Sequence, residues 1–307
     1  MLKVKERNRF LGYTRKALRF FLYFIFVLIC IMALGGKKLI GKIKQVRNEQ
    51  QKEDVLSKQQ ELEDKYGINI FVYEDEFLDR SSEVFERISF ENNSDTIINA
   101  LDDMDEILGR LPEGLLENNV KKDNVLDIYL CNKYDFEIGT DGRLGGLLYY
   151  YENVEGMAII LVIENEERVK KSFCHEIFHL LDSQISTEKK DYTTWNEINP
   201  RGYNYLSESE RNHLFNMNLP YCPENEKNVE NIFFVSEYSH SSEREDMAEI
   251  FSYLLYVDGS NELPEVFESP HVRKKAEYII KLLKEGYPCV AENSYWERIY
   301  REKVYVE

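Results

Sequence analysis

The sequence has few cysteines, and none of them is paired in a metal-binding motif. Five cysteines occur among 307 residues, and no two form a CxxC pair, which argues against a zinc cluster built from thiolates. Four of the five lie in the long region after residue 36, too few for a disulfide framework in a domain of that size. A Cys222–Cys289 disulfide is one alternative, and free buried thiols are the alternative that we favour.

The sequence also lacks a glycine-rich phosphate loop, internal repeats and an excess of positive charge. Its net charge is −17, with 56 acidic and 39 basic residues, and the basic residues crowd the N-terminus. Because an acidic surface repels phosphate backbones, we expect no nucleic-acid partner. Hydrophobic residues make up 43 % and aromatic residues 13 % of the chain, which supports a packed core and argues against a disordered chain.

A run without charge near the N-terminus indicates export. Residues 20–36 (FFLYFIFVLICIMALGG) form 17 uncharged positions, which meets the lower limit for a helix that spans the hydrocarbon core. The preceding residues 1–19 are short and basic, which favours an N-terminus inside and a body outside. We therefore predict a cytoplasmic basic segment at 1–19, a transmembrane anchor at 20–36 and an extracellular domain beyond it.

A cleaved signal peptide is the alternative to an anchor. Ala33-Leu34-Gly35 offers small residues at a spacing typical of a cleavage site. Cleavage would secrete the protein, so both interpretations export the domain. A buried core helix fits less well, because the basic clusters that flank residues 20–36 would then have to lie in the core.

The rest of the chain predicts a stalk followed by one α+β domain. Residues 37–65 are rich in Lys, Gln and Glu and predict a solvated helical stalk, and the domain covers residues 66–307. β-rich runs predict strands at 67–73, 125–130, 147–151 and 157–163, and apolar periodicity predicts helices from 94 to before Pro112 and at 243–257, 272–283 and 294–300. Segments 195–200 and 219–223 look loop-rich. Strands with one helix, followed by helices, indicate a small mixed sheet and a helical C-terminal lobe.

The segment His175-Glu176-Ile177-Phe178-His179 has helical periodicity and lies in the helix that is predicted directly after the apolar run at 157–163. Residues four apart share one face of a helix, so His175 and His179 can present two imidazole nitrogens to one zinc ion. Glu176 would lie at the open side of the metal, where it can take the proton of a bound water. A surface helix with two unrelated histidines would explain the pair but not the glutamate between them.

A catalytic zinc ion needs a third protein ligand. The downstream candidates are His240, Glu243, Glu245 and Glu249. Glu245 and Glu249 are one turn apart in a predicted helix, so one can bind the ion while the other accepts a hydrogen bond from the far nitrogen of a histidine ligand. An exposed, solvated helix face is the alternative for such an acidic pair.

In the order of these motifs, the sequence resembles the zincin peptidases related to anthrax lethal factor and the bacterial Pro-Pro endopeptidases. The matching residues are His175 to His179, Asp182, Tyr238 and 245–251 (EDMAEIF), within about residues 157 to 254. The resemblance implies a zincin-like metallopeptidase fold that binds one zinc ion per chain. It assigns His175, His179 and Glu245 as ligands and Glu176 as the general base.

The resemblance also implies supporting roles for three residues. Tyr238 lies seven residues before Glu245, and its phenol would donate a hydrogen bond to the developing oxyanion or protonate the leaving amine; ordinary packing is the alternative. Glu249 would support a ligand from the second shell. Asp182 would orient a ligand or cap the end of the helix.

Two features depart from the family pattern. Glu245 follows His179 by 66 residues, which leaves room for a long insertion that could reshape the cleft or form a lid. Phe178 stands where these families often have a smaller residue. Neither departure removes a ligand, and both bear on substrate preference.

The sequence thus predicts a zinc metallopeptidase that hydrolyses extracellular or cell-envelope proteins. A strand at 157–163 would form the edge of the sheet, line the cleft and pair with an extended peptide. An inactive zincin-like module that binds a surface partner is one alternative, although a pure binder would not need Glu176. A zinc amidase acting on envelope peptides is the other.

Overall fold

The structure is a computed structural model. It describes residues 45–74, 82–91, 93–116, 126–135, 145–152, 156–185, 190, 192–256, 263–290 and 294–304. The predicted segments 1–19 and 20–36 lie outside the described residues. In the described part of the chain, no helix is both long and apolar enough to cross a membrane. The chain divides into two compact units, Met1–Asp54 and Val55–Glu307.

Residues 45–66 are helical, and the second half of this helix belongs to the larger unit. Val55 and Leu62 are fully buried in its core, and Gln59 Nε2 donates a hydrogen bond of 2.7 Å to the backbone oxygen of Ile70. The structure therefore differs from a solvated stalk that continues to residue 65. Val55 and Leu62 are two turns apart and share one face of the helix, which explains their common burial.

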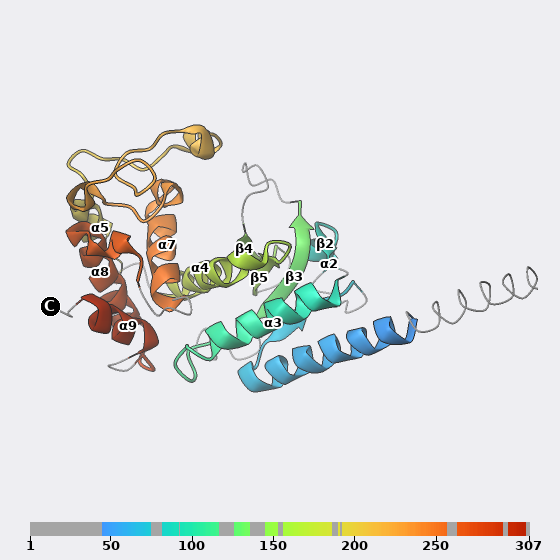
Figure 1. The fold of residues 1–307 in the computed structure, drawn as a ribbon. Helices are drawn as coiled ribbons and strands as arrows, with labels where there is room; N and C mark the ends of the chain where they lie inside the picture. The colour runs from blue at the N-terminus through green and yellow to red at the C-terminus, as the bar shows by residue number, and fades with distance from the viewer. Residues whose placement is uncertain are drawn as a thin grey trace, which may run out of the picture. The chain divides into compact units, whose positions relative to one another are not determined.

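A five-stranded mixed sheet lies in one half of the larger unit, and the helices that follow residue 191 lie in the other (Figure 1). β1 (Asn69–Phe71), β3 (Asp127–Tyr134) and β5 (Met157–Val162) are parallel, and β4 (Gly146–Tyr150) pairs antiparallel with β5. The strand order is β1-β3-β5-β4, and β2 (Ile88–Phe90) pairs antiparallel with β3. The predicted α+β class with a small mixed sheet is confirmed.

The predicted position of the edge strand is wrong. β5, which covers most of 157–163, is paired on both sides, with β3 and with β4. Its continuous apolar run from Ala158 to Leu161 is fully buried, as expected for a strand covered on both faces. Among the described strands, β4 has β5 as its one partner, so β4 forms this edge of the sheet.

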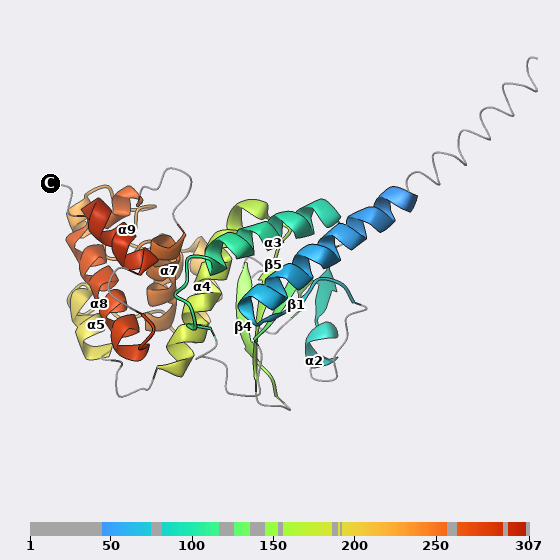
Figure 2. The ribbon, with the colours of Figure 1, turned by 90° about the horizontal axis from the view of Figure 1, so that it is seen from below.

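The two faces of the sheet carry different layers (Figure 2). Ile159 and Leu161 face the main core, together with residues of α3 (Ser94–Leu108) and α4 (Glu166–Gln184). Ala158 and Ile160 face a second cluster, which includes Val84 of α2 (Ser82–Phe85). Alternate residues of β5 thus point to opposite faces, and α4 is held directly against the sheet.

A helical lobe follows the sheet and contains α5 (Tyr192–Ile198), α7 (Glu243–Leu255), α8 (Pro270–Gly286) and α9 (Tyr295–Val304). The last three confirm the predicted helices. α5 lies in a segment predicted to be loop-rich, and its Trp195 is fully buried with its ring 5.4 Å from that of Tyr278. Tertiary packing of this tryptophan therefore outweighs the local loop signals.

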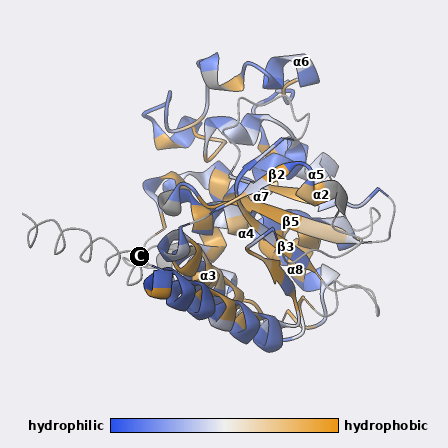
Figure 3. Ribbon diagram, turned by 90° about the vertical axis from the view of Figure 1, so that its right-hand side faces the viewer, coloured by the Kyte–Doolittle hydropathy of each residue, from blue (hydrophilic) through white to orange (hydrophobic). Residues whose placement is uncertain are grey.

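The segment between α5 and α7 is built of short helical turns and loops. The elements are α6 (Glu208–Arg211), η3 (Leu214–Asn216), η4 (Val229–Asn231) and η5 (Glu237–His240), and η6 (Glu265–Glu268) follows α7. Figure 3 shows that hydrophobic residues concentrate on the sheet and that hydrophilic residues dominate near α6. Cys131, Cys174, Cys222 and Cys289 are free thiols, so the preference for free cysteines over a Cys222–Cys289 disulfide is confirmed.

Candidate metal centre

α4 places the two histidines and the glutamate between them at one site. The apolar face of this helix, with Phe173 and Ile177, packs into the core. His175, Glu176 and His179 keep only 7, 5 and 8 % of their surface exposed. Because α4 is fixed by packing over its length, the imidazoles one turn apart are held in place before any ligand binds.

His175, His179 and Glu245 converge on one point. The Nε2 atoms of the two histidines are 3.0 Å apart, and Glu245 Oε2 lies 2.9 Å from that of His175 and 3.2 Å from that of His179. Zinc bound tetrahedrally at about 2.0–2.1 Å would separate its ligand atoms by roughly 3.3 Å. In the described residues, these three side chains are the group that could hold a metal ion. The donor set and its spacing therefore fit one zinc ion.

Glu249, one turn after Glu245 on α7, orients the first histidine. Its Oε1 lies 3.2 Å from His175 Nδ1. Burial raises the pKa of Glu249, but Lys171 and the hydrogen bond to His175 outweigh this effect and lower it to about 2. Because an ionised carboxylate can only accept, Nδ1 carries the hydrogen, which leaves Nε2 as the nitrogen for a metal.

The acidic surroundings of His175 attract positive charge. Burial alone lowers the pKa of this imidazole, but hydrogen bonds to Glu245 and Glu249 raise it to about 10. A divalent cation between His175 Nε2 and Glu245 Oε2 would take the place of the proton that these carboxylates hold there. Metal binding at this site is therefore coupled to proton release.

The first turn of α7 is tied to α4 through Asp182. This fully buried carboxylate accepts a hydrogen bond of 3.0 Å from Arg244 Nε, and its other oxygen lies 2.9 Å from Lys190 Nζ. In the described structure, Asp182 forms no hydrogen bond or ion pair with either histidine. Asp182 instead binds Arg244, the residue before Glu245. This ion pair holds Glu245, the third candidate ligand, beside α4.

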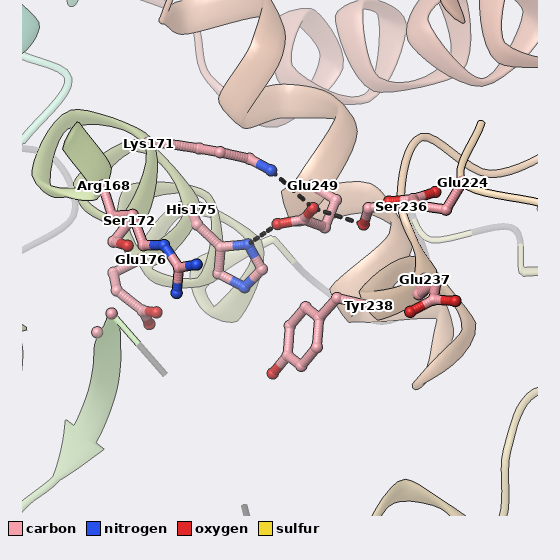
Figure 4. A pocket seen from close by; sticks show the side chains of 12 residues that line it. Arg168, Lys171, Ser172, His175, Glu176, Glu224, Ser236, Glu237, Tyr238 and Glu249 are labelled. Atoms are coloured by element: carbon pink, nitrogen blue, oxygen red, sulfur yellow. Dashed lines mark hydrogen bonds and ion pairs between the residues drawn. The ribbon is translucent and has the colours of Figure 1, made fainter. Parts of the chain in front are cut away.

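Tyr238 comes from η5 and faces the same site. Its ring centroid lies 5.8 Å from that of His175, and Figure 4 shows its hydroxyl directed into the pocket. Burial and the charge of Glu245 raise the pKa of this phenol well above its usual value. Tyr238 therefore keeps its proton and can donate a hydrogen bond.

Two other candidate ligands lie elsewhere. His240 Nδ1 contacts the hydroxyl of Tyr203 at 2.6 Å, and its ring packs 4.1 Å from that of Phe234. Glu243 accepts a hydrogen bond of 3.3 Å from Asn196. Neither residue belongs to the group that could hold a metal, which leaves Glu245 as the third member.

A pocket of about 390 Å³ opens beside the cluster. Sequence reasoning missed several of its residues: Arg168, Lys171, Ser172, Glu224, Ser236 and Glu237. Lys171 and Ser236 hold Glu249 Oε2 at 3.0 and 2.7 Å. The position of Lys171, one helical turn before His175, is a signal that could have found it. The position of Ser236 depends on the path of the insertion.

Gly146, at the start of β4, leaves room for Glu176. A Cβ atom at this position would lie 2.7 Å from Glu176 Cγ and 3.1 Å from its Oε1. Real side chains do not approach so closely, so any larger residue must displace the glutamate. Burial raises the pKa of Glu176, against the lowering effect of His175 and His179.

If Glu176 takes part in catalysis, Gly146→Ala should reduce the rate without removing the metal. We expect a decrease of about 10–100-fold in kcat/KM, because small displacements of a catalytic group have large effects on rate. Zinc content and the thermal unfolding midpoint, measured on the same preparation, should stay close to those of the wild type. Unchanged kcat/KM would show that Glu176 does not need its observed position.

Comparison with known proteins agrees with this geometry. One family model, described as "Putative zinc-binding metallo-peptidase", matches residues 151–289. In these residues, the chain is similar to zinc-binding metallo-peptidases. The three clustered side chains all lie within the match, so the family model and the site indicate the same class of protein.

Other comparisons add little to this match. No curated protein matches the chain. A crystal structure of a protein from Bacteroides caccae, described in the same words as the family, is 13 % identical with a TM-score of 0.43. The similarity covers 84 % of this chain and 93 % of that one.

Proposed function

We propose that the protein is a zinc-dependent metallopeptidase that hydrolyses peptide bonds, with Glu176 as its general base. The observation that carries this proposal is the convergence of His175, His179 and Glu245 within 3.2 Å of one another. The family match to residues 151–289 supports the same class.

Zinc bound by these three residues would polarise the scissile carbonyl and bring the pKa of a bound water towards about 7. Glu176 and Tyr238 perform the remaining steps. Glu176 accepts the proton of the attacking water and passes it to the leaving amine. Tyr238, which burial keeps protonated, donates a hydrogen bond to the oxygen that becomes negatively charged.

The edge strand β4 offers a surface for an extended peptide. Among the described strands it pairs with β5 alone, and its first residue, Gly146, lies against Glu176 of α4. A peptide that pairs with the free side of β4 would gain backbone hydrogen bonds and pass beside the general base. This arrangement supports peptide binding on β4 rather than on the strand at 157–163.

The proposed family relationship, location and substrates rest on the sequence. The motif order supports a relationship to the peptidases of the lethal factor and Pro-Pro endopeptidase type. The basic segment 1–19 and the apolar run 20–36 support export of the domain, either membrane-anchored or secreted. Extracellular or cell-envelope proteins are therefore the substrates that we propose.

Removal of the metal tests the proposed function. Purified full-length protein should cleave members of a peptide library, lose this activity after treatment with a zinc chelator and regain it when one equivalent of zinc is added. The expected loss is complete within detection, because the unassisted water is a poor nucleophile.

Cleavage that persists after zinc has been removed from the protein would contradict this proposal. Stoichiometric zinc without cleavage of any peptide would instead favour the inactive binding module. Cleavage limited to small envelope-derived amides would favour the amidase.

A further inference from the structure

The pocket beside the metal cluster has charges of opposite sign on two sides. α4 contributes Arg168 and Lys171, whereas the segment between α4 and α7 contributes Glu224 and Glu237. Figure 4 shows these two groups on opposite sides of His175 and Tyr238. A substrate that enters the pocket therefore meets an electrostatic gradient across the reacting bond.

On the α4 side, the charge of Lys171 is already compensated. Its Nζ lies 3.0 Å from Glu249 Oε2 and 3.3 Å from the hydroxyl of Tyr253. Arg168 is exposed and forms no ion pair within the residues that the structure describes. It lies seven residues, or two turns, before His175 and so shares its face of the helix. Arg168 is thus the cation of this side that remains available to a ligand.

On the opposite side, the acidic groups also lack a cationic partner among the described residues. Glu237 accepts a hydrogen bond of 2.9 Å from the neutral amide of Asn225, and Glu224 is exposed to solvent. These carboxylates repel an acidic group of a substrate, while the guanidinium attracts it. Attraction on one side and repulsion on the other together fix which way round a charged peptide lies.

We propose that Arg168 binds a carboxylate of the peptide substrate near the bond that is cleaved. The inference rests on the proposed peptidase function and adds its substrate class: peptides with an acidic group on the α4 side of the site. The carboxylate comes either from an Asp or Glu side chain or from the C-terminus of the peptide. The planar guanidinium can hold both carboxylate oxygens at once, which distinguishes it from a lysine.

The test measures how fast wild-type protein and two charge-reversal variants cleave a set of matched peptides. Four peptides share a cleaved core and carry Glu, Gln or Lys near the bond with an amidated end, or Gln with a free C-terminal carboxylate. Arg168→Glu reverses the charge in the pocket. Arg211→Glu makes the same change in α6, on an exposed arginine outside the pocket, and serves as the control.

Wild type and Arg211→Glu should cleave the carboxylate peptide about 2–5-fold faster than its neutral counterpart, as expected for one exposed charge pair. Arg168→Glu should lose this preference and cleave the Lys peptide faster than the neutral peptide, whereas Arg211→Glu should cleave the neutral peptide at the wild-type rate. The preference should weaken as salt is raised. A response to the Glu peptide or to the free C-terminus identifies the source of the carboxylate.

Binding gives a second readout that does not depend on catalysis. The zinc-loaded Glu176→Gln variant, with and without Arg168→Glu, should bind the same labelled peptides with the same charge preference. If wild-type protein cleaves all peptides equally and Arg168→Glu changes nothing, the role of Arg168 is refuted while the peptidase function stands. If no peptide is cleaved but binding still depends on Arg168, the peptidase function is refuted while the carboxylate site stands.

Discussion

Replacing Glu176 by glutamine should lower kcat/KM by about 10²–10⁴-fold, the range expected when a general base is removed. Glutamine has nearly the same shape as glutamate, so the contact with Gly146 is kept. It cannot accept the proton of the attacking water. Because Glu176 is not one of the three clustered residues, zinc should remain bound at one ion per chain.

Activity and zinc content must be measured on the same preparation. Glu208→Gln, an equivalent change on the exposed α6, should leave both values unchanged. Full activity of Glu176→Gln would exclude a general base at this position. Loss of zinc together with activity would instead make Glu176 part of the metal site.

Lys275→Met should lower the free energy of unfolding by about 3–5 kcal/mol, the usual cost of leaving a buried charge without its partner. Lys275 Nζ lies 2.6 Å from Asp246 Oδ2, and both side chains are fully buried. The lysine also donates a hydrogen bond of 2.9 Å to the backbone oxygen of Phe233. Its removal leaves the carboxylate of Asp246 with neutral donors, the hydroxyl of Tyr205 at 2.8 Å and the hydroxyl of Ser239.

The pair stands next to the metal cluster, because Asp246 follows Glu245 in the first turn of α7. We therefore expect weaker zinc binding in Lys275→Met as well. Burial raises the pKa of Asp246 to about 6 even though Lys275 lowers it, and burial lowers the pKa of Lys275 itself. Both shifts indicate that burying these charges is costly.

A double variant separates the cost of leaving Asp246 without a partner from the net contribution of the Lys275–Asp246 pair. Lys275→Met with Asp246→Leu removes both charges, and it should be more stable than Lys275→Met alone, because apolar replacement of a complete buried pair is often close to neutral. Urea unfolding of wild-type, single and double variants gives the comparison. A loss below about 1 kcal/mol in Lys275→Met would show that water or another group compensates Asp246.

The parts of the site that depend on local spacing could be predicted from the sequence. The pairing of His175 with His179 follows from the geometry of one helical turn. The choice of Glu245 over Glu249 did not follow from spacing, because the two are equivalent on an isolated helix. The resemblance to known peptidases suggested it, and the packing of α7 against α4 places Glu245 on the histidine nitrogens and Glu249 on the far side of His175.

Features that depend on tertiary structure could not be predicted in this way. The apolar run at 157–163 identifies a strand, but no local pattern states that β4 covers its free side. α5 forms in a segment with loop signals because Trp195 is buried. The contact of Ser236 with Glu249 requires the insertion between α4 and α7 to return to the site.

The zinc content per chain after dialysis against zinc-free buffer tests the central claim most directly. Wild-type protein should retain one zinc ion per chain, and His179→Ala and Glu245→Ala should each retain far less while remaining folded. Wild-type protein without bound zinc, or variants that keep a full equivalent, would show that these three side chains do not form the metal site.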